Sequence, residues 1–132
     1  MKPFHSLLLF ASLTFLFSSC AKKTPLQELI SEADVVKVYI STGATVPMVH
    51  YETNDIDKIK MWSGYIDEKN NATGVCNYEG KLIFKVYEDS TMMQFSLKPG
   101  CEQVAYTLAD TMYVKKLSAE GIAFLNDLKK IQ

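Results

Sequence analysis

Hydrophobic residues along the chain first recur at helical spacing and then alternate as they do in strands. Thr24 is a good helix cap and Pro25 suits the first helical position, so a short helix is expected to begin here. From residue 35 the pattern changes to alternation, with Val36, Val38 and Ile40 on one side of a strand. The domain is therefore expected to start with a helix that leads directly into a sheet.

A second strand and a second helix are expected to follow. Residues 46–53 form the strand, which should lie near a sheet edge because Pro47 cannot donate a ladder hydrogen bond. Asn54 and Asp55 are typical capping residues and open the helix. The apolar stripe of this helix consists of Ile56, Ile59, Trp62 and Ile66. Residues 67–74 are polar and rich in turn-forming residues, so they are expected to form a loop.

The rest of the chain has the pattern of a β-meander followed by a final helix. Alternating runs separated by short turns cover residues 81–87, 93–97, 104–108 and 112–116. Ser118 is the expected cap of the last helix. The buried face of this helix consists of Ile122, Leu125 and Leu128. This order predicts an α+β fold: a mostly antiparallel sheet of about five to six strands with helices packed on one face.

The N-terminus has the layout of an export signal. Lys2 supplies a positive charge, residues 7–17 form an apolar run, and the small residues Ser18 and Ser19 precede Cys20. The run is too short to span a bilayer but fits a secretory signal peptide. The four residues that end at Cys20 resemble the lipobox of bacterial lipoproteins, in the loose form common in Bacteroidota, with phenylalanine in place of the usual leucine.

This resemblance implies that Cys20 becomes the first residue of the mature protein and carries acyl chains. The alternative is an ordinary secreted protein in which Cys20 has no special role. The expected organisation is a removed signal peptide (1–19), a lipidated N-terminus with a tether and short helix (20–33), and a single α+β domain (34–132). In the lipoproteins that this N-terminus resembles, acidic residues after the cysteine can direct inner-membrane retention or surface display; the residues here are Ala21, Lys22 and Lys23, so the resemblance favours the periplasmic face of the outer membrane.

The two remaining cysteines form an even pair. Cys76 and Cys101 flank two predicted strands, and in an oxidising compartment they are expected to form a disulfide. Two free thiols are the alternative, although no Cys-x-x-Cys motif or neighbouring histidine indicates a reactive thiol. His50 is the one histidine beyond the signal peptide, so no metal-ligand spacing is present and no cofactor is expected.

Composition narrows the possible partners. The 132-residue chain has a net charge of −1, which excludes nucleic-acid binding through bulk charge. All 14 of its basic residues are lysines, so a bidentate arginine site for phosphate or carboxylate is absent. The partners that remain are the lipid bilayer, through an acylated Cys20, and an envelope protein.

No catalytic constellation is visible in the sequence. A small periplasmic enzyme that uses His50 or a carboxylate as its base remains one hypothesis, as does a structural or inhibitor protein that caps a partner through a sheet edge. The favoured hypothesis is a non-catalytic interaction module. Its candidate interaction face consists of Tyr39, Tyr87, Met92 and Tyr113, which are predicted to lie opposite the core positions of their strands or beside them.

Two further resemblances concern modification and family. Asp-Ser-Thr and Asp-Thr-Met, at predicted turns, resemble O-glycosylation motifs of exported proteins from the same bacteria and would place glycans on Ser90 and Thr111. Residues 57–128 resemble small lipoproteins of unknown function, through Lys-Ile-Lys at 58–60 and the run 76–84 that begins with a cysteine. This second resemblance supports the paired cysteines and the α+β order and implies no activity.

Overall fold

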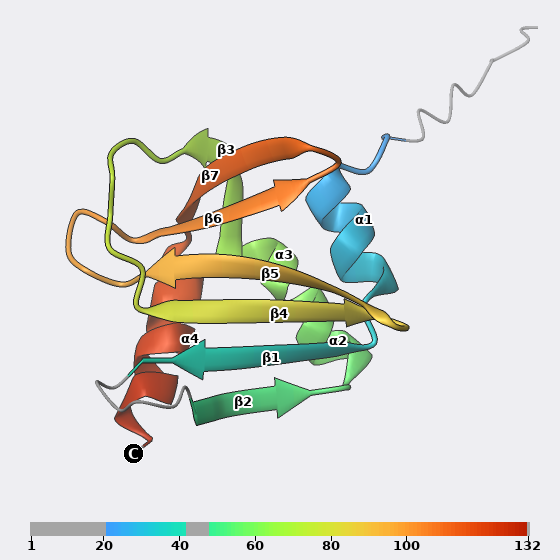
Figure 1. Ribbon diagram of the computed structural model, residues 1–132, viewed down its shortest axis with the longest axis horizontal. Coiled ribbons are helices and arrows are strands. Elements are labelled where there is room, and N and C mark those ends of the chain that lie inside the picture. Colours follow the sequence, from blue (N-terminus) through green and yellow to red (C-terminus); the bar gives the residue numbers. More distant parts are fainter. Residues whose placement is uncertain (1–20, 42–47, 132) are drawn as a thin grey trace, which may run out of the picture.

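The computed structural model describes residues 21–41 and 48–131, which form one seven-stranded antiparallel sheet with helices on one face (Figure 1). The strand order is β2-β1-β4-β5-β6-β7-β3. The predicted α+β class is confirmed, and the sheet has more strands than the expected five to six. The predicted signal peptide, Cys20 and Pro47 lie outside the described residues.

The elements alternate along the chain as the sequence pattern indicates. The strands are β1 (Val35–Ile40), β2 (Met48–Thr53), β3 (Ile66–Asn71), β4 (Gly80–Val86), β5 (Asp89–Ser96), β6 (Gln103–Leu108) and β7 (Thr111–Leu117). The helices are α1 (Pro25–Glu32), α2 (Ile56–Lys60), α3 (Trp62–Tyr65) and α4 (Ala119–Lys130). Strand β2 forms one edge of the sheet, which agrees with the predicted edge position of residues 46–53.

The extra strand lies where a loop was predicted. Most of the predicted loop 67–74 belongs to β3, which pairs with β7 at the other edge of the sheet. Only Ile66, its first residue, is buried, and the polar residues that follow become increasingly exposed. An edge strand with little buried surface lacks the alternation of apolar residues that reveals a strand in sequence. The prediction of a loop was wrong for this reason.

Side-chain caps fix the ends of the first and last helices. Thr24 is the predicted cap of α1: it accepts a hydrogen bond from the Gln27 backbone N–H, and the Gln27 side chain accepts one from the Thr24 N–H, so the two residues form a capping box. Ser118 caps α4 in the predicted way by accepting from the Gly121 N–H at 3.1 Å. The helix expected after Asp55 is divided into α2 and α3 at Met61.

The core lies between the sheet and the helices. Trp62, Phe84 and Phe95 are its largest fully buried side chains. Leu26 and Ile30 of α1 belong to the same cluster, so α1 is part of the folded domain. Ile56 was expected in this core, but it is the first residue of α2, is covered by no neighbouring element and is 64% exposed. Within the described ranges no helix is long and apolar enough to cross a membrane.

Candidate interaction face

The helices cover only one face of the sheet, and strand alternation turns every second side chain to the other face (Figure 1). We call this other side the open face. It consists of Lys37 and Tyr39 on β1, Lys81, Ile83 and Lys85 on β4, Ser90, Met92 and Gln94 on β5, Ala105 and Thr107 on β6, and Met112, Val114 and Lys116 on β7. No helix of the described chain packs over these side chains, although at the disulfide end of the same face Gln103 is buried and donates a hydrogen bond to Tyr78 of the segment before β4. The open face therefore mixes apolar, hydroxyl and lysine side chains.

The sheet splits in its middle, between β5 and β6. These strands pair through three residues each, and their pairing ends at Gln94↔Ala105. By contrast, β5 remains paired with β4 up to Val86↔Asp89, and β6 with β7 up to Leu108↔Thr111. The β4–β5 and β6–β7 hairpins therefore separate towards their tips, as Figure 1 shows on its right side.

The separation leaves backbone hydrogen-bonding groups without a ladder partner. Both hairpins have two-residue turns, and such a turn is closed by a hydrogen-bonded pair. Counting from these pairs, alternate residues of β5 bond to β4, so the backbone N–H and C=O of Ser90 and Met92 point to the opposite side. By the same count from the β6–β7 turn, the backbone N–H and C=O of Thr107 in β6 point towards the gap. On the side of the gap, the described residues provide no strand partner for these three positions, so the backbone groups that point into the gap are available to a ligand.

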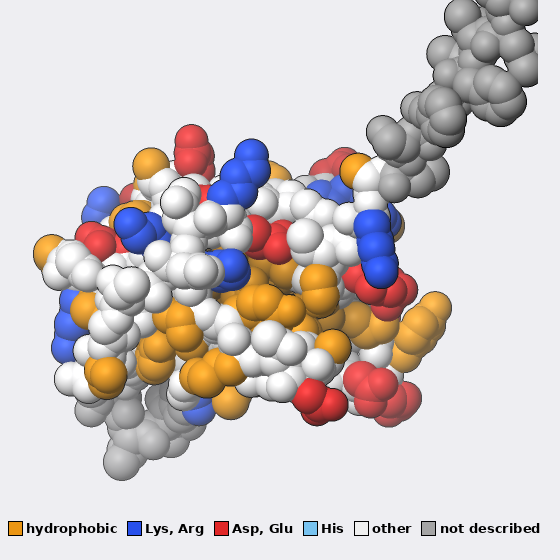
Figure 2. All heavy atoms as spheres, turned by 90° about the horizontal axis from the view of Figure 1, so that it is seen from above, with side chains coloured by type: hydrophobic (Ala, Val, Ile, Leu, Met, Phe, Trp, Pro, Cys, Tyr) orange, Lys and Arg blue, Asp and Glu red, His pale blue; other side chains and the backbone are white. Residues whose placement is uncertain are grey.

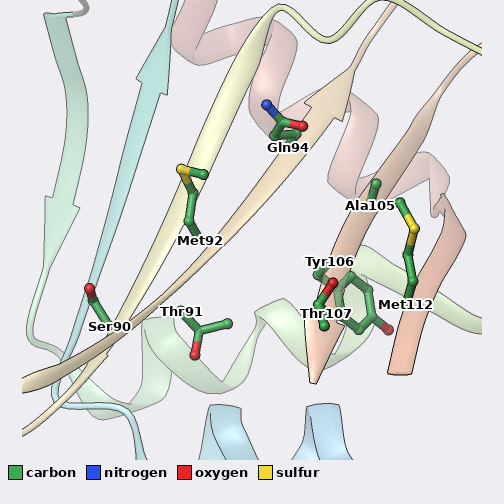
Figure 3. A pocket seen from close by; sticks show the side chains of 8 residues that line it. All are labelled: Ser90, Thr91, Met92, Gln94, Ala105, Tyr106, Thr107 and Met112. Atoms are coloured by element: carbon green, nitrogen blue, oxygen red, sulfur yellow. The ribbon is translucent and has the colours of Figure 1, made fainter. Parts of the chain in front are cut away.

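A hollow of about 390 Å³ lies at this split. Its lining comes from three strands: Ser90, Thr91, Met92 and Gln94, then Ala105, Tyr106 and Thr107, then Met112. Met92 and Met112 lie on opposite sides of it (Figure 3). None of the lining residues is charged, and burial, helped by the nearby Glu68 carboxylate, raises the pKa of the Tyr106 hydroxyl. The hollow is therefore a neutral site of hydroxyl, amide and thioether groups.

A second hollow adjoins the first on the open face. It has a volume of about 190 Å³ and shares Gln94 with the larger one. Tyr39 and Lys81 contribute to its lining. Because the two hollows share Gln94, they lie next to each other on the open face, and we refer to the pair as the depression, which extends from β7 across β5 to β1.

Unpaired lysines border this depression. Lys85 stands opposite Ser90 and Lys81 opposite Gln94 in the β4–β5 ladder. In the part of the chain that the structure describes, neither lysine takes part in an ion pair, whereas Lys37 pairs with Glu52 at 3.7 Å. The β4 side of the hollow therefore carries positive charge although the lining is neutral.

The open face holds two of the four residues predicted for an interaction face. Tyr39 and Met92 both lie on it, and Met92 is 51% exposed. Tyr87 lies in the β4–β5 turn at a φ of 54° and donates its backbone N–H to the Asp34 carboxylate at 2.8 Å. Its ring is highly exposed, at the tip of the hairpin beside the split rather than on the sheet.

Tyr113 lies on the other face, contrary to the prediction. Its cross-strand neighbour is Tyr106, whose ring it stacks on at 5.3 Å between centroids, and both belong to the helix-covered side. Met112 and Val114 looked like the inward residues of β7 in the sequence. The two-residue turn at Ala109 and Asp110 sets the register, and this register turns Tyr113 inward and leaves Met112 71% exposed.

Hydrophobic surface also continues around the β3–β7 side of the molecule. Figure 2 views the molecule from that side and shows hydrophobic side chains gathered in the middle, with charged side chains mostly around the outline. The two predicted glycosylation positions, Ser90 and Thr111, are exposed next to the hairpin turns, and Ser90 also lines the larger hollow. Their modification stays a prediction.

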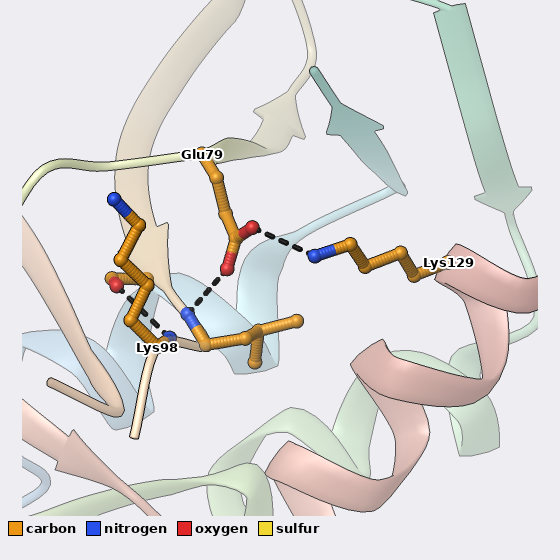
Figure 4. Close-up of polar contacts among 5 residues, drawn as sticks. Glu79, Lys98 and Lys129 are labelled. Atoms are coloured by element: carbon orange, nitrogen blue, oxygen red, sulfur yellow. Dashed lines mark hydrogen bonds and ion pairs between the residues drawn. The ribbon is translucent and has the colours of Figure 1, made fainter. Parts of the chain in front are cut away.

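The predicted disulfide is present at the end of the sheet away from the hairpin tips. Cys76 and Cys101 are bonded, with their Cα atoms 6.0 Å apart, and join the segment before β4 to the segment before β6. The nearby Glu79 accepts hydrogen bonds from the Leu97 backbone N–H at 2.7 Å and from Lys129 at 2.9 Å (Figure 4). Burial alone would raise the pKa of Glu79, but these contacts outweigh it and lower the pKa.

The residues around His50 do not provide the partners that the alternative catalytic site would need. The half-buried His50 side chain lies on edge strand β2, and its Nε2 is buried without a hydrogen-bond partner. No carboxylate among the described residues is hydrogen-bonded to it, as a base in a catalytic pair would require. The same residues contain no group of three His, Cys, Asp or Glu side chains that could hold a metal ion.

Several residues of the candidate site were not predicted from the sequence. Gln94, Ala105 and Thr107 line the hollow, but their residue types are common on any sheet surface. What makes them a site is the end of the β5–β6 ladder at Gln94↔Ala105. A family of known activity could have assigned this site a ligand. No family model, no curated protein and no solved structure matches this chain.

Proposed function

We propose that this protein is an envelope lipoprotein, anchored by an acylated Cys20 at the periplasmic face of the outer membrane, whose domain is a non-catalytic module that binds an envelope protein. The observation that carries the proposal is the open face, where two adjoining hollows meet at Gln94 on a sheet that helices cover on one side only. A contiguous semi-apolar surface with a depression is typical of an interaction site.

The chemistry of the open face supports protein binding rather than catalysis. Met92 and Met112 are exposed and flexible, and such side chains adapt to the shape of a partner. Tyr39 adds an aromatic ring with a polar end, a combination enriched at interfaces. The hollow between the methionines contains no acid, base or nucleophile pair.

The short distance in sequence between Cys20 and α1 supports a partner at the membrane. Helix α1 begins at Pro25, five positions after Cys20, and its buried Leu26 fixes it to the domain. Even a fully extended chain of five residues reaches no further than about 18 Å. A lipid on Cys20 would therefore hold the domain close to the bilayer, within reach of membrane proteins and of other proteins at the inner side of the membrane.

Site-specific photo-crosslinking in intact cells tests the binding proposal. The photoreactive amino acid p-benzoylphenylalanine, placed at Tyr39 or at Met92, is expected to give the same protein adduct because both positions line the depression. Placed at Ile56 or at Met61, which are exposed on the helical side, it is expected to give no such adduct. Adducts from the helical positions alone, or none from the open face, would contradict the proposal.

Replacing Cys20 by serine tests the anchor separately. The variant cannot be acylated, so we expect it to move from the membrane fraction to the soluble fraction and to lose incorporation of labelled palmitate. Two or three acyl chains hold a protein firmly in a bilayer, so the expected change is nearly complete. Ser31→Ala, at an exposed position of α1, serves as the control and should stay with the membrane. Unchanged fractionation of the serine variant would refute lipidation.

A further inference from the structure

We infer that the hollow between the two hairpins takes an acidic polypeptide segment of the partner in an extended conformation, which adds to the sheet as a strand along β5. This inference rests on the proposed binding function and names the ligand class of the same site. It follows from three features of the split: the free backbone groups, the neutral lining and the lysines on its β4 side.

The free backbone groups are spaced for a strand. Ser90 and Met92 precede Gln94, the residue at which β5 begins to pair with β6, at two-residue intervals. Two residues of strand are about 6.6–6.8 Å, which is the repeat at which an incoming strand offers its own N–H and C=O groups. Thr107 presents a further free pair of groups from the β6 side. A ligand with a regular backbone satisfies these groups without any particular side-chain sequence.

The lining of the hollow suits the side chains of such a strand. Successive side chains of a strand point to opposite faces of the sheet, so every second one would lie over the open face. There they would meet Met92 and Met112, and Ala105 leaves room between them because its side chain is small. The hydroxyl of Thr107 and the amide of Gln94 offer donors and acceptors to polar side chains.

Charge decides which segments fit best. Lys85 stands beside Ser90 and Lys81 beside Gln94, one strand away from the hollow on the open face. Neither lysine is neutralised by a described carboxylate within ion-pair distance. Aspartate or glutamate side chains on the bound segment would supply the missing partners, whereas lysines would be repelled. The site thus favours acidic segments over neutral or basic ones.

The edges of the sheet are poorer places for strand addition. In the ladder of β3 with β7 the register shifts between Asp67 and Asn71, and such irregularity disfavours an added strand. Strand β2 also carries a bulge, between the partners of Val38 and Tyr39, where the extra residue His50 interrupts a regular edge. The split between β5 and β6 combines free groups on a regular strand with a hollow beside it.

Selection from a displayed library of random decapeptides tests this inference on the full-length lipoprotein in detergent micelles. We expect the recovered peptides to be rich in Asp and Glu. Their binding should fall at least about tenfold in the double variant Lys81→Glu/Lys85→Glu. The matched control is Lys58→Glu/Lys60→Glu, which makes the same charge change at exposed positions of α2 and should leave binding unchanged.

Methylation of the peptide backbone separates strand addition from simple charge attraction. Methyl groups on alternate amide nitrogens of a recovered peptide should lower its affinity at least about tenfold in one register and little in the other. Selection of non-acidic peptides, binding that survives both methylation patterns, or binding of a neutral oligosaccharide in the same hollow would overturn the inference. Crosslinks from Tyr39 and Met92 to a partner would still stand in that case, so failure of the ligand class and failure of the binding function are distinguishable.

Discussion

Replacing Trp62 by alanine is expected to lower the free energy of unfolding by about 3–5 kcal/mol, the usual cost of removing a large buried aromatic side chain. Trp62 is fully buried, and its ring meets Phe84 of the sheet at 6.0 Å and Phe124 of α4 at 5.7 Å between centroids. It also contacts Tyr65 of its own helix at 5.2 Å. One side chain thus joins α3, α4 and β4, and its loss leaves a cavity that each of them borders.

Chemical denaturation of the mature domain measures this loss. We expect the midpoint to fall while the dependence on denaturant stays constant, which shows that stability and not the compactness of the unfolded state has changed. Ile56→Ala is the matched control because Ile56 is exposed, and its effect should stay within about 0.5 kcal/mol. Equal effects of the two substitutions would mean that Trp62 does not join the three elements in solution.

Trp62 also illustrates how much of the fold the sequence predicts. Its spacing from Ile59 indicates one buried helix face, and both residues are indeed buried. The alternation of Leu82 and Phe84 with Lys81 assigns the two faces of β4 correctly. These predictions succeed because burial on one side of an element leaves a period in the local sequence. For the open face, the sequence therefore predicts which side chains of a strand such as β4 point away from the core.

The candidate site itself was beyond local sequence patterns. The split between β5 and β6 depends on how far these two strands remain paired with each other. Nothing in the composition of β6 distinguishes Ala105, which pairs with β5, from Thr107, which does not. Tyr113 shows a related limit, because turn register and stacking on Tyr106 override the apparent pattern of β7. Both features are set by contacts between strands rather than by the period along one strand.

The two ends of the sheet differ in how firmly the hairpins are held. At one end the Cys76–Cys101 disulfide and the Glu79 contacts to Leu97 and Lys129 join the segments before β4, after β5 and on α4. At the other end the β5–β6 ladder stops and the hollow opens. A covalent link at the first end restricts how the hairpins move relative to each other, so the proposed strand would enter the split while the other end of the sheet stays joined.

Removing this link with Cys76→Ala and Cys101→Ala is expected to lower the free energy of unfolding by about 3.5 kcal/mol. The disulfide closes a loop with a sequence separation of 25, and the chain-entropy model assigns about that stabilisation to a loop of this length. For a domain of this size, with a total stability of about 5–15 kcal/mol, the change is a substantial fraction. Thermal and denaturant unfolding of the double variant measure it.

A reducing agent provides the control for this prediction within the same experiment. It should destabilise the wild-type domain by a similar amount and leave the double variant unchanged, because the variant has no bond to reduce. If the loss came instead from poorer packing at Cys76, which is buried, the variant would be less stable than the reduced wild type.

The same pair of proteins also tests whether the disulfide contributes to binding. If the disulfide holds the hairpins in position for the acidic segment, the folded double variant should bind a recovered peptide more weakly than the oxidised wild type, and equal affinities would limit the disulfide to stabilising the fold.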